Sequence, residues 1–154
     1  MNPSNMEEQI NRITSKLEYM AVMMDIKEFS KKEYRKVFPQ GTVNTPIGEV
    51  KIGKNQFEKM AVKDNGKRMG LIGAMKQTLS DPIVIIQEEK DGRKAHLFIK
   101  SFINDKKTSV IVSVVVTIEE HKIVISTYKR KKRELLKKIK MAGVMTYEKT
   151  MGPA

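Results

Sequence analysis

The fold is decided by residues 81–130, which read DPIVIIQEEKDGRKAHLFIKSFINDKKTSVIVSVVVTIEEHKIVISTYKR. Four mainly apolar runs are separated by short polar segments, and they cover residues 83–86, 95–103, 110–116 and 123–128. Asp91-Gly92, between the first two runs, is a typical hairpin turn. Because β-branched runs bounded by turn residues are typical of strands, this stretch predicts a four-stranded antiparallel sheet.

The residues before the sheet favour helices. Apolar side chains recur every three or four residues near the N-terminus, at Met6, Ile10, Ile13, Leu17, Met20 and Met24. This spacing predicts an amphipathic helix that covers the sheet, and the alternative is a homodimer seam through the same helix. Further helices are expected at 30–38, 55–62 and 67–79, and a small hairpin at 43–53. The fold class is therefore α+β, with N-terminal helices packed on a four-stranded antiparallel sheet and a basic C-terminal helix.

Length and composition restrict the organisation and the chemistry. The 154 residues suffice for one core, and we expect a helical segment at 1–40, a main domain at 41–147 and a flexible tail at 148–154. The absence of Cys excludes disulfides, thiol nucleophiles and zinc ribbons. Neither a signal peptide nor an apolar run of about 18 residues is found, so we expect a cytoplasmic protein that does not bind membranes.

Positive charge is concentrated near the C-terminus. The net charge is +12, and residues 129–140 alone carry eight cations and one acid. A solvated helix face is the simpler explanation of such a run, but this density favours contact with a polyanion. Lys129, Arg130 and Arg133 are therefore candidate ligands for nucleic-acid phosphates.

Polar groups on the predicted strands suggest a site that acts on phosphate. His96 and Lys100 alternate onto one strand face on either side of Phe98, while Ser126, Thr127 and Tyr128 end the last strand. A lone strand His is more often a structural residue, and a strand Lys is often a surface charge. Glu88-Glu89 lies beside a turn, where surface charge is expected.

The order of short motifs resembles the phage-associated barnase/EndoU/colicin/RelE-like (BECR) nucleases. The resemblance covers roughly residues 42–147, and it is carried by Gly66-Lys67-Arg68, by QTLSDPIVI at 77–85, by LFIKSF at 97–102, by the valine-rich strand and by Ile125-Ser126-Thr127-Tyr128 before the basic helix. It implies metal-independent RNA cleavage, in a phage or prophage toxin acting in the bacterial cytoplasm. RNA, such as tRNA or another structured RNA, would be the substrate, and an immunity protein is a candidate partner.

Metal-free RNA cleavage uses the 2′-hydroxyl as the nucleophile, so the protein must supply a base, an acid and a cation for the charged phosphorane. His96, Lys100, Ser126 and Thr127 are the candidate catalytic residues, and Lys67, Arg68, Tyr128, Lys129, Arg130 and Arg133 the candidate substrate-binding residues. No cofactor and no metal site are expected. The alternatives are a noncatalytic RNA- or DNA-binding phage accessory protein and an oligomeric structural phage protein.

Overall fold

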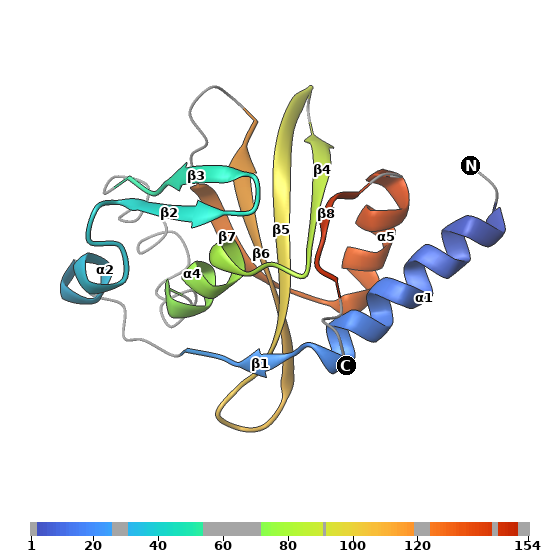
Figure 1. The fold of residues 1–154 in the computed structure, drawn as a ribbon, viewed down its shortest axis with the longest axis horizontal. Helices are drawn as coiled ribbons and strands as arrows, with labels where there is room; N and C mark the ends of the chain where they lie inside the picture. The colour runs from blue at the N-terminus through green and yellow to red at the C-terminus, as the bar shows by residue number, and fades with distance from the viewer. Residues whose placement is uncertain are drawn as a thin grey trace.

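A single sheet with elements packed on both of its faces forms the body of the chain, as seen in a computed structural model (Figure 1). The structure describes residues 3–25, 31–53, 72–90, 92–118, 124–142 and 145–150. The predicted helix at 55–62 lies outside these residues, as does the first part of the helix predicted at 67–79. Within the described residues, no helix is long and apolar enough to cross a membrane.

The four predicted strands are present and antiparallel, in sequence order. They are β4 (Val84–Lys90), β5 (Arg93–Ile103), β6 (Ser109–Thr117) and β7 (Val124–Arg130). The α+β class is confirmed, but the predicted number of four strands is wrong because the sheet has six. Strand β8 (Met145–Glu148) adds antiparallel to β4, and β1 (Val22–Met23) adds parallel to β5. Both additions are short, and pairing with distant segments, rather than a local pattern, makes them strands.

The first face of the sheet carries α2 (Lys31–Val37), the hairpin of β2 (Thr42–Thr45) and β3 (Gly48–Lys51), and α4 (Ile72–Ser80), on the left in Figure 1. Their apolar side chains pack with residues of the central strands, including Phe98, Phe102, Val112 and Val114. The alternation of β5 therefore directs His96 and Lys100 to this face, beside Phe98 as predicted.

The second face is covered by α1 (Pro3–Tyr19) and α5 (Lys132–Ala142), on the right in Figure 1. Ile13 and Leu17 of α1 and Leu135 and Ile139 of α5 are buried in one cluster with residues of β4 and β5. The helix near the N-terminus therefore covers the chain's own sheet. It ends at Tyr19, earlier than the apolar stripe suggested, because Val22–Met23 becomes extended and pairs with the end of β5.

An ion cluster fastens α1 to β8. Arg12 donates from Nε and Nη2 to the two carboxylate oxygens of Glu148, at 2.6 and 2.8 Å. Lys16, which is buried, donates from Nζ to Glu148 Oε2 at 2.5 Å and to the carbonyl oxygen of Lys149 at 2.7 Å. The hydrogen bond from Arg12 has the largest effect on the pKa of Glu148. Together with Lys16 it outweighs burial, which would raise this pKa, and the pKa is lowered from 4.5 to about 2.

Candidate functional site

The predicted phosphate-binding segment lies on both faces of the sheet. Strand β7 continues through Arg130, and α5 begins only at Lys132, so the strand is longer than predicted. Register and alternation assign Thr127 and Lys129 to the first face, opposite Val114 and Val112 of β6. In the ladder, Ser126 and Tyr128 pair with Val115 and Ser113, and Arg130 pairs with Ile111 on the second face.

Lys100 is held by Asp81, at the junction of α4 and β4. Its side chain is 2% exposed, and Nζ donates to the Asp81 carbonyl oxygen at 2.7 Å and to Asp81 Oδ2 at 3.1 Å. Lys149 donates to both oxygens of the same carboxylate at 2.8 Å. Burial lowers the pKa of Lys100, and the hydrogen bond to Asp81 offsets part of this effect. These contacts favour a structural role for Lys100, joining the start of β4 to β5.

The remaining sequence candidates lie in separate places. Thr127 is buried, and within the described part of the chain its Oγ1 has no hydrogen-bond partner. Lys129 and Arg133 are exposed, whereas Arg130 is half-buried and donates from Nε to Ser113 Oγ at 2.8 Å. Lys67 and Arg68 lie outside the described residues. Lys100 and Thr127 are buried in the sheet whereas Arg133 is exposed on α5, so these three candidates do not form one pocket.

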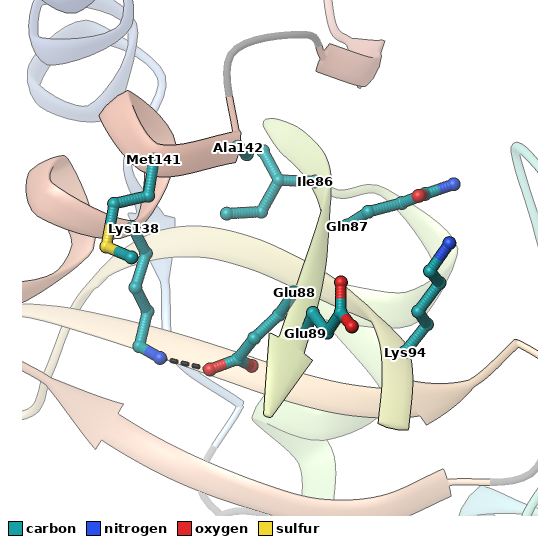
Figure 2. A pocket seen from close by; sticks show the side chains of 8 residues that line it. All are labelled: Ile86, Gln87, Glu88, Glu89, Lys94, Lys138, Met141 and Ala142. Atoms are coloured by element: carbon teal, nitrogen blue, oxygen red, sulfur yellow. Dashed lines mark hydrogen bonds and ion pairs between the residues drawn. The ribbon is translucent and has the colours of Figure 1, made fainter. Parts of the chain in front are cut away.

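A hollow of about 340 Å³ lies beside the end of β4, between that strand and α5 (Figure 2). We term it the strand-end hollow, and its lining is formed by Ile86, Gln87, Glu88, Glu89, Lys94, Lys138, Met141 and Ala142. On the α5 side, Lys138 forms an ion pair with Glu88 (Figure 2). Glu89 and Lys94 lie on the other side of the strand, so charged groups surround its end.

Register places His96 next to the hollow, opposite its lining residue Gln87, although His96 itself does not line it. Lys94 lies directly opposite Glu89, and His96 lies directly opposite Gln87, in two neighbouring pairs of the β4–β5 ladder. All four residues share the first face, since each pair is two residues from the next. Diagonal neighbours in such a ladder are about 7–8 Å apart, so Glu89 and His96 lie near each other on this face. His96 is 8% exposed, and Gln87, Glu89 and Lys94 are exposed.

The side chains of this hairpin on the first face include groups that can transfer protons and balance charge. In phosphodiester cleavage a carboxylate or an imidazole can accept or donate a proton, and an ammonium group can stabilise negative charge. Sequence reasoning found His96 but treated Glu88-Glu89 as surface charge, because the pairing of Glu89 with Lys94 depends on the hairpin register. Among the described residues, no three His, Cys, Asp or Glu side chains cluster closely enough to hold a metal ion.

Comparison with known protein families identifies a match over most of the chain. A family model described as phage-Barnase-EndoU-ColicinE5/D-RelE like nuclease 2 matches residues 24–148. The matched range contains every strand of the large sheet except β1, which precedes it. Neither the curated proteins nor the solved structures contain a match to the chain.

Proposed function

Since the chain belongs to the phage-Barnase-EndoU-ColicinE5/D-RelE like nuclease 2 family, we propose that it is a metal-independent endoribonuclease whose active site combines the strand-end hollow with the neighbouring His96. The observation that carries this proposal is the register of the β4–β5 hairpin. It aligns Glu89 with Lys94 and Gln87 with His96 on one face, at an end of the sheet that solvent reaches. The setting that we propose is a phage or prophage toxin acting on RNA in a bacterial cytoplasm.

The proposed reaction is an internal displacement at phosphorus. Glu89 accepts the proton of the 2′-hydroxyl, whose oxygen then bonds to phosphorus while the bond from phosphorus to the 5′-oxygen breaks. His96 protonates the departing 5′-oxygen, so the products are a 2′,3′-cyclic phosphate and a 5′-hydroxyl. Lys94 stabilises the charge on the phosphorane, and the Gln87 amide donates to a phosphate oxygen. These roles are supported by the register, which makes Glu89 and His96 diagonal neighbours on one face, so that a phosphate bound between them would meet both groups.

Helix α5 supports the same proposal electrostatically. Lys138 reaches the hollow from α5, and its charge is shared with Glu88 through the ion pair. Lys129 and Lys131, near the start of α5, are exposed and have no ion pair within the described residues. Cations of this kind attract RNA from any direction and without base preference, so they add affinity rather than specificity.

A cleavage assay with EDTA present tests the proposal. Total RNA and a defined oligonucleotide are incubated with the wild-type protein, with Glu89→Gln and with His96→Gln. Loss of a general acid or base lowers the rate about 10²–10⁴-fold, and both variants should fall in this range. Glu49→Gln is the matched control, because Glu49 is an exposed carboxylate on β3, in the separate two-stranded sheet of β2 and β3. It should cleave as the wild type does.

The products and a modified substrate separate the parts of the proposal. A 2′-O-methyl oligonucleotide should resist cleavage, and the unmodified one should yield 2′,3′-cyclic ends. Wild-type rates in both Glu89→Gln and His96→Gln would remove the hollow from consideration. RNA that is bound yet stays intact through long incubation would instead identify a noncatalytic RNA-binding protein.

A further inference from the structure

A second surface of α5 is built differently from the strand-end hollow. The N-terminal half of α1 and the outer side of α5 enclose an open groove of about 460 Å³, which we term the α1–α5 groove. Met6, Ile10 and Leu136 form its apolar part, and all three are half-buried. Arg133, Lys137 and Lys140 line it as well.

The cations of the groove are left without acidic partners. Elsewhere on α5, Lys132 pairs with Glu18 and Lys138 pairs with Glu88. In contrast, Arg133, Lys137 and Lys140 are exposed and form no ion pair within the described residues. Among the described lining residues Glu7 contributes the single carboxylate, so their charges sum to an excess of positive charge.

The spacing of these three cations along α5 matches a ligand that carries a row of negative charges. Arg133, Lys137 and Lys140 follow the i, i+4, i+7 pattern, so they lie along one side of α5 and span roughly 10 Å. A ligand with one carboxylate can satisfy only one end of such a row. A second helix with carboxylates at the same spacing matches the whole row, because its rise per residue is the same.

The apolar part of the groove distinguishes a helix from RNA. Bases are usually recognised by stacking on aromatic side chains, and none of the described residues that line this groove is aromatic. Aliphatic side chains such as Met6, Ile10 and Leu136 instead receive the apolar face of an amphipathic helix. We propose that the α1–α5 groove docks an acidic amphipathic helix of a partner protein, with its apolar residues on these three side chains and its carboxylates on the row of cations.

This docking leaves the strand-end hollow accessible from its own side, because α5 presents Lys138 to the hollow and Lys137 and Lys140 to the groove. The partner therefore reaches the enzyme through α5 without occupying the proposed active site. The inference does not depend on the nuclease proposal, since it rests on contacts of α1 and α5 alone.

Fluorescence anisotropy with designed peptides tests the docking site on the full chain. The probe is a labelled helical peptide about five turns long, with Leu at the i, i+3, i+4 and i+7 positions of each repeat and Glu beside them. Two comparison peptides replace every Glu with Lys, or every Leu with Ser. At physiological ionic strength the first probe should bind, and both comparison peptides should fail to bind.

Charge-reversed variants locate the binding. Lys137→Glu/Lys140→Glu should weaken binding of the probe by about tenfold or more, because two attractions become repulsions. The control, Lys51→Glu/Lys76→Glu, changes the net charge equally at exposed positions of β3 and α4, and it should bind as the wild type does. All four positions are solvent-exposed, so neither double variant removes a buried contact.

Three results would overturn the proposal. Equal binding of the Leu and Ser versions would mean that charge alone attracts the peptide. Equal weakening in the two double variants would mean that the groove is not the site. Displacement of the probe by single-stranded oligouridine, together with weaker oligouridine binding in Lys137→Glu/Lys140→Glu, would make the groove a nucleic-acid site instead.

Discussion

Replacing Glu148 with Gln should destabilise the chain markedly, because this carboxylate joins α1 to β8. Glu148 is 16% exposed and receives hydrogen bonds from Arg12 and from the buried Lys16. The pKa difference between 4.5 and about 2 corresponds to about 3 kcal/mol of stabilisation at neutral pH. The Arg12 side chain is half-exposed, and solvent screening reduces this to about 2 kcal/mol. Glu148→Gln also leaves the buried Lys16 ammonium without a counter-charge. We therefore expect the free energy of unfolding to fall by about 2–4 kcal/mol in Glu148→Gln.

The pH dependence gives an independent measurement of the same contact. A carboxylate with a lowered folded-state pKa contributes its full stabilisation above the unfolded value, and loses it as pH falls through the folded value. The contribution of Glu148 is therefore complete above about pH 4.5 and declines toward about pH 2. Urea unfolding of the wild type across this range should show that decline, and Glu148→Gln should lack about 2 kcal/mol of it.

The control for this experiment is Glu49→Gln, which changes an exposed carboxylate without a hydrogen bond to α1. Its unfolding free energy should stay within about 0.5 kcal/mol of the wild type. A Glu148→Gln protein that is equally stable at pH 7, with the same acid dependence as the wild type, would refute the reasoning. The helix α1 would then be held by its apolar face alone.

Three further substitutions test individual contacts through unfolding free energy. Gly73→Ala should destabilise by about 1–3 kcal/mol although Ala favours helices, because the added Cβ would lie 2.2 Å from the Asp25 carbonyl oxygen; a gain in stability would contradict this. Thr127→Val should stabilise by about 1 kcal/mol, because it removes a buried hydroxyl without a hydrogen-bond partner, and a large loss of RNA cleavage in this variant would indicate a phosphate contact. Asp81→Asn should cost about 1–2 kcal/mol, because it leaves the buried Lys100 ammonium without its half-exposed counter-charge, and a double variant with Lys100→Met should recover part of that loss.

The strands of the sheet could be predicted from sequence because the alternation and the turns of residues 81–130 are local properties. Strands β1 and β8 could not, since each consists of a few residues that become a strand only by pairing with β5 or β4. The candidate site likewise has one part that the sequence predicts and one part that depends on strand pairing. His96 was recognisable as a titratable residue on a strand, but its neighbours Glu89 and Lys94 follow from the register of the hairpin.

Lys100 illustrates why residue type alone is a weak guide to a site. The alternation of β5 correctly assigned Lys100 to the face of His96. The direction of its long side chain depends on Asp81, which comes from the junction of α4 and β4 and which also binds Lys149 near the end of the chain. Contacts between three distant segments therefore decide whether this ammonium is a catalytic cation or a structural one.

Helix α1 precedes the residues matched by the nuclease family model, yet it is integrated with them. Ile13 and Leu17 share a buried cluster with Leu97 and Ile99 of β5, and Glu148, the last matched residue, is bound by α1. Deleting residues 1–19 would expose this cluster to water and would leave the Glu148 carboxylate without Arg12 and Lys16. We therefore expect such a truncation to lose its cooperative unfolding transition, so a change in its oligomeric mass would report unfolding rather than a dimer seam on α1.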